Sequence, residues 1–510
     1  MAARTRLVLS LVAGAACLAA CGTTVPLQSS YSAQQPGADN GLGQSTTGGL
    51  PTSTPGQNPS LGSGSGGGTT GSVGSTGATV PGSSTSGSGG SGSTGSGASL
   101  PPVSVGGPAG SARGVTATTI KIGVYTLQGF SGFASSAGFK ASTGDQVAEA
   151  KQIIGYLNAH GGLAGRKIVP VFHDFNISAA ASNPDTEYQA ACAAWTQDDH
   201  VYAVITPVGT LDDTLYTCLT KAGVPAFASG ESQDASFFQK FANTYYQATD
   251  MNLRRVFGNE VDGLVSTGFF GAKAKVGVVY VGNPNETAAV NQGLKPALAR
   301  HGLTLADSFA VSSGSGGATE YNSAVLRFKA DGITHVLFSY LGSPLLFMQS
   351  AQNQGYHPKY GLSSRNSPAA VLQVNAPPAQ QSGAVGIGWQ PENDVDNAHD
   401  PGSIGARQKL CLSLLKQANQ DTTNRATALV GLWFCDNFFF LQDALKKAPT
   451  FALSGLRAGA EAVGTFDAAS TFTSSFGPGR LHDGAGAYRM FAFNDECACY
   501  RYTSPLRTAS

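Results

Sequence analysis

From Thr119 onward, short apolar segments alternate with helical patterns, and this alternation constrains the fold more than any other feature of the sequence. A helical pattern follows the first apolar segment, and Gly161-Gly162 ends it. Strands that alternate with helices predict a parallel sheet covered by helices on both faces. Four strands of one such sheet are predicted, at residues 120–125, 168–172, 201–205 and 224–227.

The same pattern starts again at Val276. Residues 276–280 form a predicted strand, a helix passes through Leu294 and Leu298, and His301-Gly302 ends it. The segment 202–210 (YAVITPVGT) is similar to 335–343 (HVLFSYLGS), which indicates either a repeated plan or a chance likeness between two strand-helix-strand units. We therefore predict two lobes with one architecture.

Residues 1–20 have the pattern of a bacterial signal peptide. Arg4 and Arg6 precede an apolar stretch at 7–18 that is too short to span a bilayer, and Leu18-Ala19-Ala20-Cys21 follows. This tetrapeptide resembles a lipobox. The resemblance implies that residues 1–20 are removed and that Cys21 becomes an acylated, palmitate-bearing N-terminus on the outer face of the cytoplasmic membrane. The alternative is an ordinary signal peptide with an unrelated cysteine.

Residues 21–113 have the composition of a disordered tether. Gly, Ser, Thr and Pro dominate the segment, and no charged residue lies between Asp39 and Arg113. So few large apolar side chains cannot form a core, and the expected root-mean-square span is about 50 to 60 Å. A glycosylated stalk would serve the same purpose.

Six cysteines follow Cys21, and export favours disulfides among them. Cys192 and Cys218 lie on predicted helices that flank one strand, and Cys411 and Cys435 lie on two consecutive predicted helices, so we predict these two bridges. Cys497 and Cys499 form either a third disulfide or a free pair. Zinc is disfavoured there because no histidine is clustered with them.

Beyond residue 115, the chain resembles the type I periplasmic binding proteins, in particular the receptors for branched-chain amino acids, amides and urea. The resemblance implies an α/β fold with two lobes, each a parallel sheet flanked by helices, joined by a hinge of three strands. The segments that carry it are 120–124 (IKIGV), 158–168 (NAHGGLAGRKI), 222–227 (AGVPAF), 321–332 (YNSAVLRFKADG) and 354–356 (QGY).

The resemblance also implies lobe boundaries. Lobe 1 would comprise residues 114–250 and 390–465, and lobe 2 residues 251–389 and 466–510, with crossings near Asp250, Trp389 and Thr465. In parallel sheets, ligands collect at the carboxyl ends of the strands. Six loops meet that condition, at 126–133, 207–211, 229–232, 281–286, 340–343 and 363–366.

Candidate ligand contacts follow from matching these loops to the family pattern. Thr210 and the segment Ser229-Gly230-Glu231 match loops that hold an amino-acid carboxylate and ammonium. Tyr340 lies where the family often places an aromatic ring, and Phe130 or Phe133 closes the other side, unless these rings are packed strand ends. Asn283 and Gly342 belong to two of the lobe 2 loops and complete the set.

One position departs from the family pattern. Where an acidic residue often follows the last lobe 2 strand, this chain has Ser363-Ser364-Arg365-Asn366. Arg365 would then bind a ligand carboxylate, with Glu231 as the ammonium partner across the cleft. The alternative is that both are solvated charges at the rim. The ligand class is open among modified amino acids, amides, small acids and sugars.

Several other classes of protein are disfavoured. The chain has 31 basic and 31 acidic residues and no basic run, so no nucleic-acid partner is expected. No P-loop, dinucleotide fingerprint or nucleophile elbow occurs in the folded part, so neither an enzyme nor a cofactor is expected. The acidic stretch 394–400 lacks the glycine and glutamate of a calcium loop, so a solvated loop is expected instead of a metal site.

The sequence thus predicts a lipid-anchored receptor that captures a small polar molecule and delivers it to the permease of an ABC importer. The rival prediction is an envelope sensor or scaffold that keeps this fold and binds a protein partner through a lobe surface.

Overall fold

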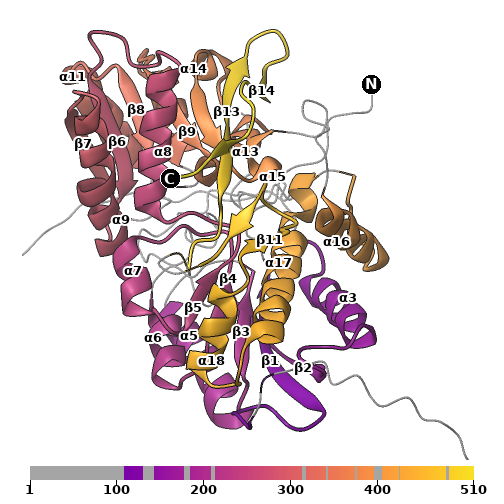
Figure 1. The fold of residues 1–510 in the computed structure, drawn as a ribbon. Helices are drawn as coiled ribbons and strands as arrows, with labels where there is room; N and C mark the ends of the chain where they lie inside the picture. Colours follow the sequence, from indigo (N-terminus) through magenta and orange to yellow (C-terminus); the bar gives the residue numbers. More distant parts are fainter. Residues whose placement is uncertain are drawn as a thin grey trace, which may run out of the picture. The chain divides into compact units, whose positions relative to one another are not determined.

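The computed structural model describes residues 108, 110–129, 143–176, 184–207, 213–312, 318–340, 343–373, 376–395, 405–423, 425–477, 480 and 482–510 (Figure 1). The predicted signal peptide, Cys21 and almost all of the predicted tether lie outside this part of the chain. Within it, no helix combines the length and the hydropathy that a bilayer span requires.

The first sheet has five parallel strands in the order β2-β1-β3-β4-β5. The central strand β3 is buried along its whole length, as expected of a strand covered on both faces. The strands are β1 (Thr119–Gln128), β2 (Lys167–Asn176), β3 (Ala203–Thr206), β4 (Ala226–Ala228) and β5 (Tyr245–Gln247). The helices between them are α3 (Gln146–Ala159), α5 (Pro184–Ala193), α6 (Thr214–Lys221) and α7 (Ala235–Lys240), and a π-helical turn, η1 (Ala194–Asp198), follows α5.

The second sheet runs β14-β13-β10-β9-β8-β6-β7. Its strands from β7 to β10 are parallel, whereas β13 is antiparallel to β10, β14 and β15. These strands are β6 (Val276–Val281), β7 (Leu305–Val311), β8 (His335–Phe338), β9 (Lys359–Ser363), β10 (Val385–Gly388), β13 (Ala487–Asn494), β14 (Cys499–Tyr502) and β15 (Arg507–Thr508).

Helices precede β6 and connect the parallel strands of the second sheet, and a last short helix, α15, follows β10. They are α8 (Leu253–Ser266), α9 (Pro284–Ala289), η2 (Val290–Leu294), α10 (Lys295–Arg300), α11 (Ala318–Ala330), α12 (Ser343–Asn353), η3 (Ser364–Asn366), α13 (Pro368–Gln373), α14 (Pro378–Gln381) and α15 (Pro391–Asp394). In both sheets, helices connect successive parallel strands, so the predicted α/β fold class is confirmed. The antiparallel strands β13 to β15 are an addition to the prediction.

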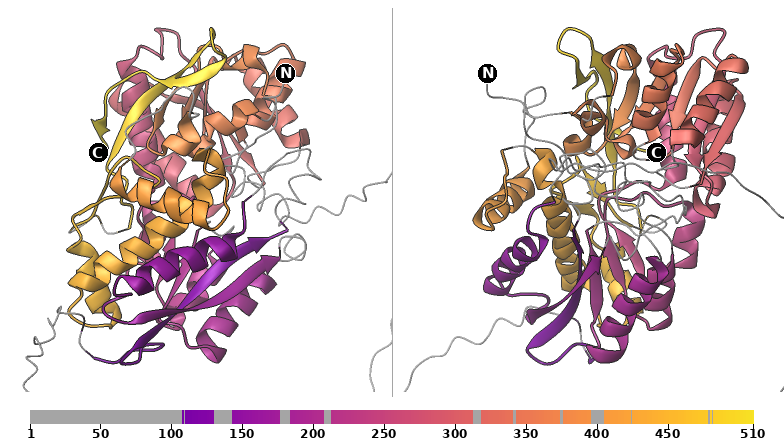
Figure 2. Two further views of the ribbon diagram at one scale, coloured as in Figure 1. Left: turned by 90° about the vertical axis from the view of Figure 1, so that its right-hand side faces the viewer. Right: turned by 180° about the vertical axis from the view of Figure 1, so that it is seen from behind.

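After β10 the chain returns to the first sheet. The helices α16 (Ala406–Gln417), α17 (Arg425–Lys447) and α18 (Leu453–Glu461) share one hydrophobic core with β1, β3 and β4, and they can be followed in two further views in Figure 2. α17 is the main contributor because apolar side chains occupy nearly every face of its middle turns, including Leu429, Trp433 and Phe440. Burial on all sides is expected of such a helix.

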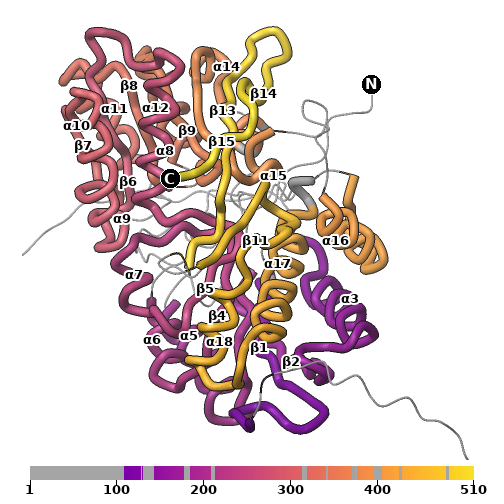
Figure 3. Tube along the Cα trace, viewed as in Figure 1, coloured from indigo at the N-terminus to yellow at the C-terminus, as the bar shows by residue number. Residues whose placement is uncertain are grey.

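Three chain segments near residues 247–252, 389–390 and 471–485 are hydrogen-bonded to one another, and they lie where the sequence predicts the hinge, so we call them the hinge segments (Figure 3). The Gln247 carbonyl accepts from the Gly484 amide at 2.9 Å, and the Asp250 carbonyl accepts from the Ala485 amide at 3.1 Å. The Trp389 carbonyl accepts from the Thr471 hydroxyl at 2.6 Å. Within the third segment, β12 (Ser474–Ser475) pairs in antiparallel fashion with β11 (Thr465–Phe466), which precedes the segment.

The structure contains both predicted disulfides, Cys192–Cys218 and Cys411–Cys435. The first joins α5 to α6 on either side of β3, and the second joins α16 to α17. The remaining pair is also bonded: Cys497–Cys499 closes the short turn between β13 and β14. Of the two options for this pair, the structure has the third disulfide.

Candidate ligand-binding site

The predicted contacts that the structure describes lie just beyond the carboxyl ends of four parallel strands. Ser229, Gly230 and Glu231 follow β4, Asn283 follows β6, Tyr340 follows β8 and Arg365 follows β9. Phe130, Phe133, Thr210 and Gly342 lie outside the described residues. The described candidates therefore lie where the carboxyl-end rule predicts them, at the carboxyl-terminal edge of the first sheet and at that of the second sheet.

Arg365 is buried and held from several directions. Its side chain is only 8% exposed, and its Nη2 donates to Oε1 of Glu286 at 2.7 Å. Its Nε donates to the Ser339 carbonyl, and its guanidinium lies 5.4 Å from the centre of the Tyr340 ring. Burial acts to lower the pKa of Arg365, but Glu286 and Glu231 outweigh it and raise that pKa. The alternative of a solvated rim charge is wrong for Arg365, because its neighbours replace water.

Glu231, a carboxylate near Arg365, has one oxygen without a hydrogen-bond partner. Its Oε2 is enclosed by protein atoms and has no hydrogen-bond partner, although the residue as a whole is half-buried. Burial raises the pKa of Glu231 to about 8, whereas the nearby charge of Arg365 and a hydrogen bond from the Gln233 side chain to the carboxyl group oppose this rise. A solvated carboxylate would keep its usual pKa. The enclosed Oε2 favours a role of Glu231 inside the site over a solvated rim charge, and a contact between Glu231 and a ligand stays a prediction.

Asp250 is a second buried carboxylate beside Glu231, and it was not among the predicted contacts. Its Oδ1 accepts from Nε2 of Gln390 at 2.7 Å, and its Oδ2 accepts from the Gly230 amide at 3.1 Å. Burial raises the pKa of Asp250 to about 7, against the influence of Arg365. Asp250 thus links the loop after β4 to the hinge.

The hydroxyl of Ser229 is used inside the first sheet's core. It donates to Oδ1 of Asn437 on α17 at 3.1 Å and accepts from the Thr249 hydroxyl at 3.3 Å. Ser229 is fully buried, so this network fixes the shape of the loop. A direct contact between Ser229 and a ligand stays a prediction.

Gly230 is required by the shape of this loop. Its φ of +77° lies in the left-handed region, and a Cβ there would lie 2.8 Å from a ring carbon of Trp433. Any side chain at this position would displace Trp433 or the loop. The backbone amide that Gly230 presents is already bonded to Asp250.

Asn283 caps α9 and thereby orients Glu286. Its Oδ1 accepts from the Glu286 amide at 2.8 Å, which is a standard N-cap contact. Glu286, one turn into the helix, then binds Arg365 through Oε1 and accepts from the Ser339 hydroxyl through Oε2. Sequence reasoning missed Glu286, and the only signal that could have found it is its position at the end of the 281–286 loop.

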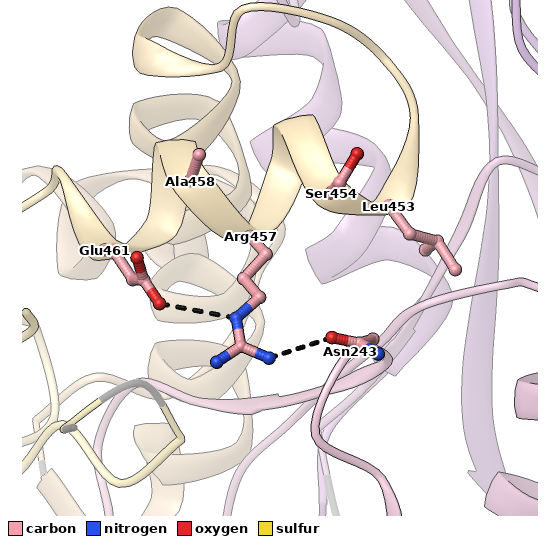
Figure 4. Close-up of a pocket in the computed structure, with 6 residues that line it drawn as sticks. All are labelled: Asn243, Leu453, Ser454, Arg457, Ala458 and Glu461. Carbon is pink, nitrogen blue, oxygen red and sulfur yellow. Dashed lines mark hydrogen bonds and ion pairs between the residues drawn. The ribbon is translucent and has the colours of Figure 1, made fainter. Parts of the chain in front are cut away.

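A surface hollow lies elsewhere on the molecule. It has a volume of about 390 Å³ and is lined by Asn243, Leu453, Ser454, Arg457, Ala458 and Glu461 (Figure 4). Arg457 donates to Asn243 and to Glu461 across it, at 2.9 and 3.3 Å. Asn243 precedes β5, whereas the cluster around Arg365 follows the strands, so the hollow is not part of that cluster.

The described residues offer no candidate metal site. No three His, Cys, Asp or Glu side chains among them group around a common point, and all six cysteines in the described ranges form disulfides. Most of the acidic stretch 394–400 lies outside these ranges. Asp394 itself is buried and accepts from the Tyr502 hydroxyl at 2.6 Å, so the expectation of a solvated position is wrong there.

Comparison with known structures shows the same architecture in bacterial and archaeal proteins. An ABC transporter substrate-binding protein from Aeropyrum pernix aligns with a TM-score of 0.58 at 12% identity, covering 77% of this chain and 97% of that chain. A substrate-binding protein from Desulfitobacterium hafniense in complex with Leu gives 0.52 at 15% identity, covering 76% and 100%. A solute-binding protein from R. palustris in complex with 4-hydroxybenzoate gives 0.53 at 12% identity, covering 76% and 96%.

A comparison with curated protein sequences gave no significant match. A family model described as periplasmic binding protein, in contrast, matches residues 119–492, which include every parallel strand of both sheets. The match spans well over half of the chain, and the structural likenesses above show the corresponding fold. The protein therefore belongs to the periplasmic binding protein family and has its type I fold.

Proposed function

We propose that this protein is a lipid-anchored, extracytoplasmic receptor that captures a small polar molecule, amino-acid-like or amide-like, and delivers it to an ABC importer. The observation that carries the proposal is the cluster of Glu231, Asp250, Glu286 and Arg365, which draws on strand ends of both sheets. Buried charged groups at such edges are costly unless they serve a ligand or a partner group.

The hinge supports a receptor that opens and closes. We assign residues 114–250 and 390–465 to lobe 1 and residues 251–389 and 466–510 to lobe 2, with the three hydrogen-bonded segments between them. A ligand that contacts both lobes binds the closed state better than the open state and so shifts the population toward closure. The chemistry is binding, with no catalytic step.

The fold alone does not identify the ligand. The two ligand complexes named above contain Leu and 4-hydroxybenzoate, and a related structure is a fatty acid ABC transporter substrate-binding protein from Thermomonospora curvata. The ligand class of this chain must therefore come from its own side chains. We propose Tyr340, Ser229 and Glu231, with Thr210, Phe130, Phe133 and Gly342 from the loops outside the described residues, as the lining of the site.

A thermal-shift screen of the processed chain, with its disulfides formed, tests the receptor function. The library would contain amino acids, amides, sugars, nucleosides and small organic acids. A ligand at one hundred times its dissociation constant stabilises the folded state by about 2.7 kcal/mol and raises Tm by a few degrees. A hit that Tyr340→Ala abolishes and Tyr156→Ala on α3 preserves would support the proposed site. If the folded protein bound nothing in a broad library, the sensor or scaffold function would replace the receptor.

Lipid anchoring at Cys21 has its own test. Cells grown with a labelled palmitate analogue should incorporate the label into the wild-type protein and should release the Cys21→Ser variant from the membrane fraction. Cys17→Ser serves as the matched control, because Cys17 lies in the apolar stretch before the lipobox. Labelling of the Cys21→Ser variant would contradict the anchor without affecting the binding proposal.

A further inference from the structure

The charges of the cluster bear on the class of ligand that the receptor takes. Three carboxylates, Glu231, Asp250 and Glu286, lie near one guanidinium, that of Arg365. When all four groups are ionised, the carboxylates outnumber the cation. A buried cluster with such an imbalance favours the uptake of positive charge.

Two of the three carboxylates have their partners within the protein. Glu286 binds Arg365 through Oε1 and accepts from the Ser339 hydroxyl through Oε2. Asp250 accepts from Gln390 through Oδ1 and from the Gly230 amide through Oδ2. Both oxygens of each carboxylate are therefore engaged.

Glu231 differs from these two. Its backbone carbonyl accepts from the Gln247 side chain, which fixes the position of the residue. The Gln233 side chain donates a hydrogen bond to the carboxyl group, but Oε2 is enclosed and has no hydrogen-bond donor of its own. An enclosed carboxylate oxygen without a donor is unfavourable in the unliganded protein. A donor brought by a ligand would remove this cost.

Arg365 does not present a free positive charge to an anion. Its ion pair with Glu286 is buried on both sides, with side-chain exposures of 8% and 2%, and its Nε is bound to the Ser339 carbonyl. The Tyr340 ring lies against the guanidinium. An anionic ligand would meet the carboxylates around this pair, whereas a cationic ligand would be attracted by them.

We propose that the ligand is a small organic cation that places a positively charged nitrogen against Oε2 of Glu231. This inference rests on the proposed receptor function and specifies its substrate class: amines without a free carboxylate bind more tightly than amino acids, and both bind more tightly than carboxylic acids. The ammonium donates a charge-assisted hydrogen bond to Glu231, and the Arg365–Glu286 pair remains intact.

Binding should also release protons. Because burial raises the pKa of Glu231 to about 8, the carboxyl group of Glu231 is mostly protonated at neutral pH when no ligand is bound. A bound cation stabilises the ionised form, so the carboxyl group loses its proton on binding. The affinity for a cation is then expected to rise as the pH increases from about 6 to 8.

Isothermal titration calorimetry on the processed chain can test both consequences with ligands that share an alkyl group and differ in the charged groups attached to it. The series 3-methylbutylamine, leucine and 4-methylpentanoate shares one branched alkyl group, and its amine stays protonated across this pH range; the corresponding alanine and phenylalanine series vary the size of the side chain. We expect at least a tenfold preference for the amine cation over the acid, and titrations in two buffers of different ionisation enthalpy should show proton release.

Glu231→Gln tests the assignment to this residue. The variant should lose at least tenfold in cation affinity and should release fewer protons than wild type, since Asp250, whose pKa burial raises to about 7, still contributes. Glu260→Gln is the matched control, since Glu260 is also a buried glutamate whose pKa burial raises to about 8, but it lies on α8. Proton release in the wild type remains informative if Glu231→Gln does not fold.

The outcomes separate this inference from the receptor function. Tighter binding of the acids, or unchanged cation affinity in a folded Glu231→Gln variant, would overturn the cationic class and leave the receptor in place. Binding by none of the series, together with a silent ligand screen, would overturn both.

Discussion

Nε2 of Gln390 donates a 2.7 Å hydrogen bond to Oδ1 of Asp250, and the two residues are 140 positions apart in the sequence. The bond joins the first hinge segment to the second. The same Gln390 amide lies 3.3 Å from the Thr249 carbonyl, and the other oxygen of Asp250 binds the Gly230 amide. Asp250 therefore ties the hinge to the loop that carries Glu231.

The first prediction concerns this pair. Gln390→Ala removes the donor to Oδ1 of a buried carboxylate, and we expect a loss of about 1 to 3 kcal/mol in the free energy of unfolding. Urea titrations of Gln390→Ala, Asp250→Asn and the double variant form a double-mutant cycle. Additive losses in that cycle would mean that the two hinge segments are not coupled through this bond.

Most of the fold was predictable because buried parallel strands are continuous apolar runs in the amino-acid sequence. β1, β2, β3, β4 and β6 were expected within a few residues of their observed ends. β5 and β7 were not expected, since β5 is only three residues long and β7 alternates with polar residues at the edge of the sheet. A local pattern carries little information about such strands.

The antiparallel end of the second sheet was not predictable for a different reason. β13 pairs with β10 about one hundred residues earlier in the sequence, and only the return of the chain through the hinge places it there. Its partner is fixed by tertiary structure and not by its own residues.

The site was predictable only in part. The carboxyl-end rule located Glu231, Asn283, Tyr340 and Arg365 at strand ends. The partner of Arg365 could not be inferred from the sequence. Glu286 lies 79 positions earlier in the chain than Arg365, and it reaches Arg365 from a helix that Asn283 caps. Sequence position identifies the edge of a sheet, whereas partners at that edge depend on helix orientation.

A second prediction follows from Glu260, a carboxylic acid enclosed between α8 and the second sheet. Both of its oxygens lack a hydrogen-bond partner, and burial raises its pKa to about 8. Since the pKa is higher in the folded than in the unfolded protein, the stability that this group contributes is complete below pH 4 and is lost as the pH rises to about 8.

Glu260→Gln removes that proton linkage. Its free energy of unfolding relative to wild type should therefore increase between pH 5 and pH 8, by about 1.4 kcal/mol per pH unit at most. Urea unfolding of both proteins at pH 5, 6.5 and 8 measures the difference. A difference that does not change with pH would show that Glu260 is not protonated in the folded state.

The disulfides should contribute unequally to stability. Cys192–Cys218 closes a loop of 26 residues and should contribute roughly 3 kcal/mol through the entropy of the unfolded chain. Cys497–Cys499 spans a separation of 2, so the same model gives about 1.5 kcal/mol. The paired alanine variants, compared by thermal unfolding, should follow this order. An equal loss from both would show that loop length does not control the effect.

Two helical glycines provide a test of packing between α17 and α18. A Cβ at Gly459 on α18 would lie 2.2 Å from the Ala444 carbonyl oxygen of α17, whereas a Cβ at Gly155 on α3 would have no heavy atom within 4 Å. Gly459→Ala must push the helices apart, and overpacking of this kind costs about 1 to 3 kcal/mol. Gly155→Ala should instead stabilise the protein by up to about 1 kcal/mol, because alanine is the better helix former.

Opposite shifts of Tm are expected for the two variants. A Gly459→Ala variant as stable as wild type would mean that α18 can move away from α17 at no cost, and the Gly155→Ala value gives the helix-propensity gain to subtract in that comparison.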